Sequence, residues 1–379
     1  MIDFSHAHKK LRERIQLFIE TEVPFSQAFT IDRNDQYPQE IMDKMARSGF
    51  MAVNIPPKYG GEGGGDLEVM IMCEEICKRL PALSWTWGNV CLYGNNIISI
   101  NGSEEQREKY LPSLAKGEMR FAFGLTEPDA GSDAANIRTT AELKNGEWIL
   151  NGSKMFITGG IKSDVVVTFA RTAASRYSGI TAFLVDTRLA GFSKHHMHKL
   201  GYRGSDTAEL VYENVRVKPD AILGGEEGLN NGWVQMVRLL NGERLALSAC
   251  ALGIGQAALT EAVNHYKLSV SAGTAVAAQN VEHRLAEMAT ELEAARSLAY
   301  HAAWLQMNGK ECVKETSMSK IFCAETAKKI AVEAMEVMGP DGYVMASAVQ
   351  RQLRDVLILS IGGGTTQIQK NIVAKAIGL

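Results

Sequence analysis

The hydrophobic pattern of this 379-residue chain changes its period twice, and that order limits the folds it can adopt. Residues 3–118 place apolar side chains at helical spacing, residues 121–228 alternate them with a period of two, and residues from 233 onward return to the helical period. The β-branched runs at 165–170 and 181–185 are typical of strands. The pattern predicts an α+β fold in which an antiparallel β-domain, a barrel or sandwich, lies between two helical domains.

These changes of period predict three domains: an N-terminal α-helical domain over 1–120, a middle β-domain over 121–229 and a C-terminal α-helical domain over 230–379. In the last of these we expect helices over 233–268, 279–307, 312–338 and 344–357, and then a short final one. Asn145-Gly146 and Asn151-Gly152 stand between alternating segments, and such pairs favour hairpins or tight turns.

Bulk composition excludes several classes of protein. The net charge of −3 argues against binding to nucleic acid or to an anionic membrane as the main function of the chain. We find no apolar run of membrane-spanning length and no apolar core of a signal peptide at the start, so we expect a cytoplasmic protein. The six cysteines lie mostly inside apolar helical patterns, which indicates free, buried thiols in a reducing compartment.

Two neighbouring motifs suggest a site for a flat, anionic cofactor. The loop at 124–133 reads GLTEPDAGSD, and its Pro and Gly residues can bring backbone N–H groups close to an anion. Thr126 and Ser132 add hydroxyl donors to this loop. The second motif, NGSKMFITG at 151–159, places Thr158 at the end of a strand, with Phe156 able to cover one face of the cofactor. The alternative for the first motif alone is an ordinary polar loop.

Together these motifs resemble the flavin-binding signature of the acyl-CoA dehydrogenases, and the resemblance extends over nearly the whole chain. It includes KLGYRGSDTAEL at 199–210, NGERL at 241–245, ALGIGQ at 251–256 and GGGTTQIQ at 362–369. Members of that family have an N-terminal helical domain, a middle β-domain and a C-terminal domain of the four-helix type. The resemblance implies bound FAD, with contacts from Phe123, Leu125, Thr126, Ser132, Phe156, Thr158, Thr365 and Gln367.

The resemblance also implies a reaction. A carboxylate removes the α-proton of an acyl-CoA thioester while the β-hydrogen leaves as hydride to the flavin, which gives a 2-enoyl thioester. In most of the family the base is a Glu directly before the C-terminal Gly-Thr, but here that position is Gly363. A minority, including isovaleryl- and long-chain-type enzymes, carry the Glu just before an Arg on the first long helix after the β-domain. Glu243, followed by Arg244, occupies that position.

The two changes compensate each other, because a small residue at 363 leaves room for a carboxylate that arrives from the other side. Leucines surround Glu243 in the sequence, which predicts an apolar setting and a raised pKa. The alternatives are that Glu243 is an ordinary helix-surface residue and that the chain is inactive or takes its base from elsewhere. By resemblance, the substrate-binding residues are Tyr93, Asn95, Ser132, Asn241, Arg244, Gly363 and Gly364.

The acyl end of the substrate pocket is the least informative part of the sequence. Asn95 and Asn96 lie on the segment that closes this end in the family, and two asparagines there suggest a short or polar acyl group. The alternative is that both face solvent or cap a turn.

The chain departs from the family where a neighbouring subunit normally grips the adenylate and pyrophosphate half of FAD. The usual Arg, Phe and Pro of that hairpin are Ser269, Ala272 and Ala275 here, and Glu336 replaces a Gln in a second segment. Loss of the arginine removes charge-assisted bonding to phosphate. We therefore weigh a homotetramer or homodimer with weakened FAD binding against an α2β2 heterotetramer with a paralogous partner.

The family reading names an acyl-CoA substrate and an electron-transfer flavoprotein as partners. Three alternatives keep the fold: action on a carrier-protein thioester, non-oxidative elimination, and a subunit that lends structure without turnover of its own. His195, His196 and His198 could suggest a metal, but no carboxylate or Cys stands at matching spacing. We read that segment as an exposed strand and expect no metal, no nucleic acid and no membrane.

Overall fold

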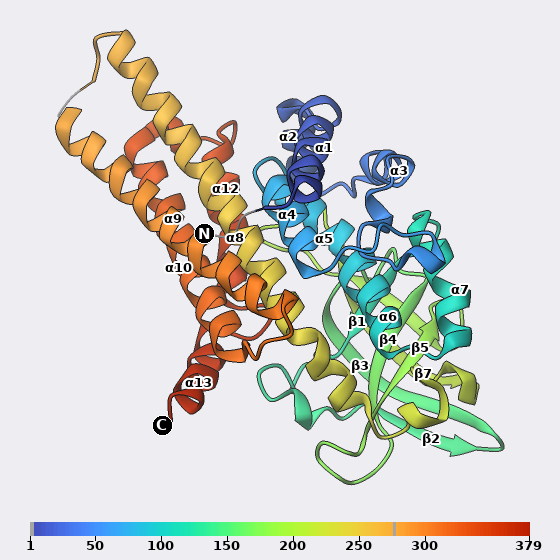
Figure 1. The fold of residues 1–379 in the computed structure, drawn as a ribbon. Coiled ribbons are helices and arrows are strands. Elements are labelled where there is room, and N and C mark those ends of the chain that lie inside the picture. Colours follow the sequence, from blue (N-terminus) through green and yellow to red (C-terminus); the bar gives the residue numbers. More distant parts are fainter. Residues whose placement is uncertain (1–3, 276–277) are drawn as a thin grey trace.

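The computed structural model describes residues 4–275 and 278–379, so residues 1–3 and 276–277 of the predicted outer domains lie outside the described residues. A β-sheet, a group of N-terminal helices and a bundle of long C-terminal helices pack together (Figure 1). The N-terminal helices connect the other two parts: α5 contacts strands β1 and β3 of the sheet, and α4 contacts α8 and α9 of the bundle. The predicted helix–strand–helix order is confirmed.

Two of the N-terminal helices begin at a serine whose side chain caps the helix. Ser5 accepts a hydrogen bond from the His8 N–H at the start of the first helix, and Ser103 does the same for Gln106. The helices are α1 His6–Glu22, α2 Phe25–Asn34, α3 Gln39–Arg47, α4 Asp66–Cys77, α5 Pro81–Val90, α6 Ile97–Asn101 and α7 Glu104–Ala115. A wide π-helical turn, η3 Cys91–Asn96, joins α5 to α6.

Seven strands form one sheet in the order β1-β4-β2-β3-β7-β6, with β5 paired to β4. They are β1 Phe121–Gly124, β2 Thr140–Lys144, β3 Glu147–Thr158, β4 Val165–Arg171, β5 Ile180–Asp186, β6 Phe192–His196 and β7 Thr207–Val217. Most pairs are antiparallel, but β4 runs parallel to β1 and, at one residue pair, to β2. The predicted antiparallel β-domain is confirmed for most strand pairs and wrong for these two. Residue alternation shows which face a side chain occupies and not which strands become neighbours.

The two Asn-Gly pairs have different outcomes. Asn145 and Gly146 have φ of 54° and 81° and close the β2–β3 hairpin, as predicted. Asn151 and Gly152 form no turn, because β3 continues through them to Thr158 with an irregular register against β7. The Asn151 side chain bonds to Asn214 of β7, where the Asn214 N–H donates to Asn151 Oδ1 at 2.8 Å, and so maintains the pairing across the irregularity.

The C-terminal bundle follows the predicted helices closely. It consists of α8 Gly232–Ser271, α9 Ala278–Met307, α10 Val313–Met338, α11 Pro340–Tyr343, α12 Ala348–Val356 and α13 Thr366–Ala376. Helix α8 extends from the sheet to the far end of the bundle (Figure 1). By length and composition α8 also passes as a candidate membrane span, contrary to the sequence expectation, but 67% of its most apolar window is buried inside the protein. We read α8 as the core helix of the fold.

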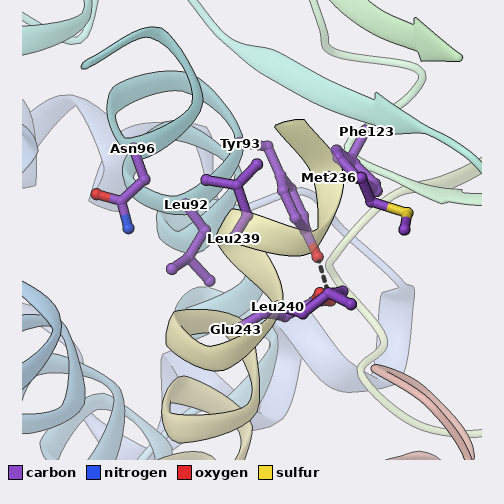
Figure 2. Close-up of a pocket in the computed structure, with 8 residues that line it drawn as sticks. All are labelled: Leu92, Tyr93, Asn96, Phe123, Met236, Leu239, Leu240 and Glu243. Atoms are coloured by element: carbon purple, nitrogen blue, oxygen red, sulfur yellow. Dashed lines mark hydrogen bonds between the residues drawn. The ribbon is translucent and has the colours of Figure 1, made fainter. Parts of the chain in front are cut away.

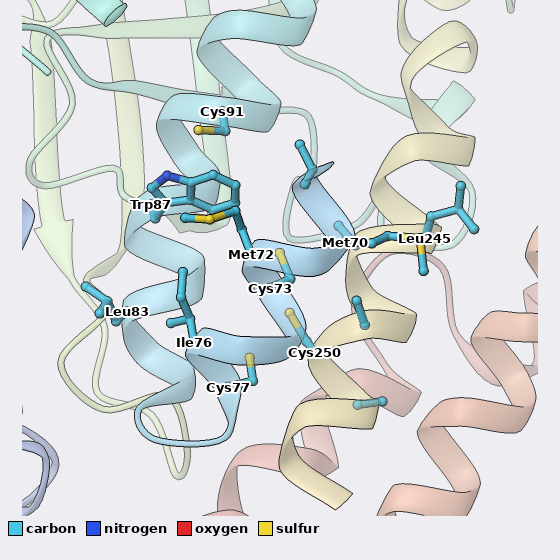
Figure 3. Close-up of a cluster of buried hydrophobic side chains, with 14 of the residues drawn as sticks. Met70, Met72, Cys73, Ile76, Cys77, Leu83, Trp87, Cys91, Leu245 and Cys250 are labelled. Atoms are coloured by element: carbon cyan, nitrogen blue, oxygen red, sulfur yellow. The ribbon is translucent and has the colours of Figure 1, made fainter. Parts of the chain in front are cut away.

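All six cysteines are free and buried, as predicted. Cys73 and Cys77 on α4 face Cys250 on α8 in the helical core, among Met70, Met72, Ile76, Trp87 and Leu245 (Figure 3). The Cys77 thiol donates to Ser84 Oγ at 3.1 Å. Burial raises the pKa of the Cys91 thiol well above its usual value, so that side chain packs as a small apolar group.

Candidate active site

Glu243 lies in a small pocket where α8 meets β1 and the π-helical turn η3 (Figure 2). The Tyr93 hydroxyl, on that turn, donates a hydrogen bond of 2.8 Å to Glu243 Oε1. The remaining wall is mostly apolar and consists of Leu92, Asn96, Phe123, Met236, Leu239 and Leu240. The free volume is about 10 Å³, which is room for about one water molecule. The carboxylate is therefore in the water-poor setting that the sequence predicted.

Burial raises the pKa of the Glu243 carboxyl above its usual value of 4.5. The hydrogen bond from Tyr93 and the positive charges of Arg244 and Lys320 act in the opposite direction and favour the ionised form. Burial also lowers the pKa of Lys320 to about 8, since Glu243 only partly offsets the cost of desolvating the ammonium group. A carboxylate whose pKa is raised by an apolar pocket is a stronger base than one in water.

Gly363 lies directly across from this carboxylate. A Cβ atom added at residue 363 would stand 3.9 Å from Glu243 Oε1 and 2.2 Å from Leu247 Cδ1. Its φ of +63° also lies in the region that favours glycine. A side chain at residue 363 would therefore clash with Leu247 and begin within 4 Å of the Glu243 carboxylate. The structure brings together the two positions that the sequence analysis related, and the role of Glu243 as the base stays a prediction.

The turn that contains Gly363 is held by polar side chains. Lys320 Nζ donates to the Gly364 carbonyl at 2.7 Å, and Gln369 Nε2 donates to the Gly363 carbonyl at 2.9 Å. The N–H groups of Gly363 and Gly364 make no hydrogen bond within the described part of the chain. They remain available as donors beside the Glu243 carboxylate.

Asn241 and Arg244 lie on α8 next to Glu243 and belong to one polar cluster. The Arg244 guanidinium is buried, and its Nη1 donates to Asn241 Oδ1 at 3.4 Å. Thr316 Oγ1 on α10 donates to the same oxygen at 3.3 Å. Arg244 Nε has no hydrogen-bond partner among the described residues. Arg244 thus keeps donor capacity for a ligand, which agrees with its predicted role in substrate binding without establishing it.

Glu127 fixes the first predicted flavin loop to the second motif. Its carboxylate accepts hydrogen bonds from the N–H groups of Arg138 at 2.5 Å and Thr139 at 3.0 Å, and from Lys154 Nζ at 2.7 Å. Lys154 is fully buried and also donates to the Leu125 carbonyl at 3.2 Å. Burial lowers the pKa of Lys154 to about 8, although the charge of Glu127 opposes this shift. The sequence reasoning missed this ion pair, although both residues lie within the two motifs it identified.

The hydroxyls predicted to contact the flavin are all on this β-domain surface. Thr126 and Ser132 belong to the loop that Glu127 holds, and Thr158 ends β3. None of the three side chains makes a hydrogen bond to another described residue. A set of uncommitted hydroxyl donors and acceptors suits the polar edge of a flavin ring.

Phe156 stands out among the apolar residues of the predicted flavin site. Its side chain is 62% exposed, and its φ is +59°, which is uncommon for a bulky residue. Phe123 and Leu125 are partly buried, and Phe123 stacks on Tyr93 with ring centroids 5.1 Å apart. An exposed aromatic ring in a constrained backbone conformation fits the role of covering a flat ligand.

The structure gives the remaining predicted residues less direct roles. Thr365 caps α13 by accepting from the Ile368 N–H at 3.2 Å, and Gln367 is exposed on that helix. Asn95 does not line the pocket: its amide is fully buried and donates to the Met51 carbonyl and to Asn54 Oδ1. Asn96 lines the pocket instead, because the wide turn η3 directs neighbouring residues differently from a regular helix.

The structure also describes the histidine segment and the two segments that in the family normally reach the FAD of a neighbouring subunit. His195 and His196 are exposed in β6 and His198 follows it, and the described residues contain no cluster of metal ligands. Ser269 lies in the last turn of α8, where its hydroxyl donates to the His265 carbonyl. Glu336 forms an ion pair of 2.6 Å with Arg284, so its charge is partly compensated.

A helical–β–helical chain with a buried carboxylate beside these motifs belongs to the class of flavin-dependent oxidoreductases. Three family profiles match it in order: "Acyl-CoA dehydrogenase, N-terminal domain" over residues 5–118, "middle domain" over 122–215 and "C-terminal domain" over 230–378. The chain therefore belongs to the acyl-CoA dehydrogenase family.

Individual relatives agree with this assignment. The chain is 40% identical to an acyl-CoA dehydrogenase of Bacillus subtilis (strain 168), over 96% of each chain. It is 35% identical to the "Caffeyl-CoA reductase-Etf complex subunit CarC" of Acetobacterium woodii, over 98% of each chain. The structure of butyryl-CoA dehydrogenase from Megasphaera elsdenii superimposes with a TM-score of 0.93 at 31% identity, covering 100% of this chain and 99% of that one.

Proposed function

We propose that this chain binds FAD and catalyses the α,β-dehydrogenation of an acyl-CoA thioester with Glu243 as the base. One observation carries the proposal: Glu243 Oε1 lies 3.9 Å from the position that a Cβ atom at residue 363 would take. This closeness supports the idea that Glu243 replaces the base that most of the family carries at that position. The apolar wall around it raises the pKa of Glu243 and suits it to accept that proton.

The bound flavin would accept the β-hydrogen as hydride. Thr126, Ser132 and Thr158 offer their uncommitted hydroxyls to its polar edge, and the exposed ring of Phe156 covers one face. Phe123, Leu125, Thr365 and Gln367 complete the proposed set of contacts. The ion pair between Glu127 and Lys154 keeps the loop in place.

The substrate would lie between α8 and the Gly363-Gly364 turn. The free N–H groups of that turn can donate to the thioester oxygen as negative charge develops there. In this proposal Asn241 and Arg244 contact the pantetheine arm, Tyr93 borders the pocket beside Glu243, and Ser132 contacts the substrate from the flavin loop. The carbonyl is thus polarised by fixed donors while Glu243 removes the proton.

We expect a short acyl group, because bulky side chains crowd the space beside Glu243 and would have to move apart to admit any acyl chain. Six bulky side chains leave about 10 Å³ beside Glu243. Leu92→Ala would remove part of this wall without touching the carboxylate. We therefore expect the preferred acyl chain to lengthen by one to two carbons. Because a buried methylene group is worth about 0.8 kcal/mol, kcat/KM for the longer substrate should rise by about tenfold. Steady-state kinetics over a series of straight-chain acyl-CoAs measures this. An unchanged chain-length profile would contradict the idea that this wall of the pocket, which includes Leu92, borders the acyl group.

Partners follow from the same reasoning. The A. woodii relative is named as a subunit of a reductase–Etf complex, and we infer that electron-transfer flavoprotein exchanges electrons with this chain too. That relative's name also favours a second candidate, the reduction of an enoyl-CoA, in which Glu243 would return the proton.

We further infer a cytoplasmic location and a homotetramer or homodimer, with a heterotetramer as the alternative that Ser269, Ala272 and Ala275 suggest.

The visible spectrum of the purified chain tests the cofactor and the reaction together. We expect one FAD per subunit and bleaching of the flavin absorbance when butyryl-CoA is added without oxygen. Bleaching by butyryl-CoA but not by a carrier-protein thioester supports the CoA substrate. A chain that holds less than one FAD unless a paralogue is co-expressed would instead establish the heterotetramer, and full FAD without bleaching by any thioester would contradict the proposed reaction.

A further inference from the structure

Tyr93 contacts the Glu243 carboxylate, and nothing in the family resemblance assigns it that role. We infer that Tyr93 is a positioning residue that holds the catalytic base in its productive orientation and stabilises its ionised form. The inference rests on the proposed function of Glu243 as the base. It goes beyond that function by naming the side chain that makes the base competent.

The contact has no equivalent elsewhere in the site. Among the residues that the structure describes, the Tyr93 hydroxyl is the one group that hydrogen-bonds to Glu243, at 2.8 Å from Oε1. Arg244 on α8 and Lys320 on α10 also act on the carboxylate by their charge. Within the described part of the chain neither of them forms a hydrogen bond or ion pair with Glu243, so their charge does not fix its orientation.

The backbone that carries Tyr93 is held firmly. Tyr93 belongs to the π-helical turn η3, and such wide turns inside helices frequently occur at functional sites. Asn95 secures the turn through its bonds of 2.9 Å to the Met51 carbonyl and 2.8 Å to Asn54 Oδ1. Gly94 packs so closely that an added Cβ would lie 2.8 Å from Leu114 Cδ2. The Tyr93 side chain thus starts from a fixed point.

The ring is fixed as well. It stacks on Phe123 of β1 with an interplanar angle of 22°, and Phe123 in turn packs on Phe169 of β4 at 4.9 Å. Figure 2 shows the phenol oxygen directed at the Glu243 carboxylate. A rigid aromatic side chain that donates to a carboxylate across two elements is a preorganised support for a base.

Tyr93→Phe tests this inference because it removes the hydroxyl and keeps the stacked ring. Without the donated bond the pKa of Glu243 should rise, so we expect the acid limb of the kcat/KM–pH profile to move up by about one pH unit. On the alkaline plateau kcat should fall while KM for butyryl-CoA changes little, because the aromatic ring of residue 93 still borders the pocket and the other substrate contacts remain. The matched control is Tyr212→Phe, which removes a buried hydroxyl that lies 2.8 Å from Thr168 Oγ1 in the β-domain.

The outcomes are separable. A shifted acid limb in Tyr93→Phe with an unshifted limb in Tyr212→Phe, at equal flavin content, supports the positioning role. If the acid limb of the kcat/KM–pH profile lies at the same pH in both variants and in the unsubstituted protein, the positioning role of Tyr93 is overturned. If Glu243→Gln retains full activity, the proposed function itself fails, whereas an inactive Glu243→Gln beside an unchanged Tyr93→Phe profile removes only this inference.

Discussion

Glu243→Gln is expected to lower kcat for butyryl-CoA by about 10²–10⁴-fold, the range in which a positioned general base contributes to rate. Glutamine keeps the size of the side chain and can still accept the hydrogen bond from Tyr93. What it lacks is an oxygen basic enough to take the α-proton. The measurement is steady-state reduction of a dye by variant and unsubstituted protein that contain equal flavin.

A matched control is available on the same helix. Glu261→Gln removes the same charge from α8 at a site that lines a different hollow, beside Phe25 and Met338, and it should leave kcat within about twofold. Exchange of the butyryl-CoA α-hydrogen with D2O offers a second readout, since it follows proton removal directly. If Glu243→Gln exchanges and turns over at the unsubstituted rate, another residue is the base.

The pH dependence of activity also tests whether Glu243 is the base. Burial raises the pKa of Glu243, and the base works only when ionised. Activity of the unsubstituted protein should therefore fall as the pH drops through a value above 4.5, the usual pKa of the carboxyl group. A profile that stays flat down to pH 4.5 would argue against a buried Glu243 as the base.

The sequence, through the family resemblance, pointed to Glu243 as the proposed base but not to the hydrogen bond that Tyr93 donates to it. Glu243 and Gly363 were related by comparing two positions with a family pattern, and the structure shows them to be neighbours. Tyr93 lies 150 residues before Glu243 in the chain, and no local pattern indicates that they meet. Asn95 was predicted to contact the substrate, but its buried amide donates to the Met51 carbonyl and to Asn54 Oδ1, partners about 40 residues away that no local pattern shows.

The fold shows the same division between local and long-range information. Helices of the C-terminal bundle were predicted well because their apolar period and ends are local properties. The parallel β1–β4 pair was not predicted, because it joins segments that the whole β2–β3 hairpin separates in the sequence. Glu127 and Lys154 are a further example: two charged residues of separate motifs form a buried pair that depends on how those segments meet.

The stability of the flavin loop should depend on that buried pair. Lys154→Met is expected to lower the free energy of unfolding by about 3–5 kcal/mol, since it leaves the Glu127 carboxylate buried without its cationic partner. The N–H groups of Arg138 and Thr139 remain as donors to Glu127 but carry no charge. Because Lys154 also bonds to the Leu125 carbonyl, the loop should loosen and the variant should retain less flavin.

Urea denaturation and the flavin-to-protein ratio after gel filtration measure both effects. Lys144→Met is the control, because Lys144 pairs with Glu142 on the exposed end of the β2–β3 hairpin and its loss should cost at most about 1 kcal/mol. The double variant Glu127→Gln/Lys154→Met removes the uncompensated charge and should recover part of the loss. If the double variant is as unstable as Lys154→Met, the cost arises from lost packing and backbone bonding by Lys154 and not from the charge of Glu127.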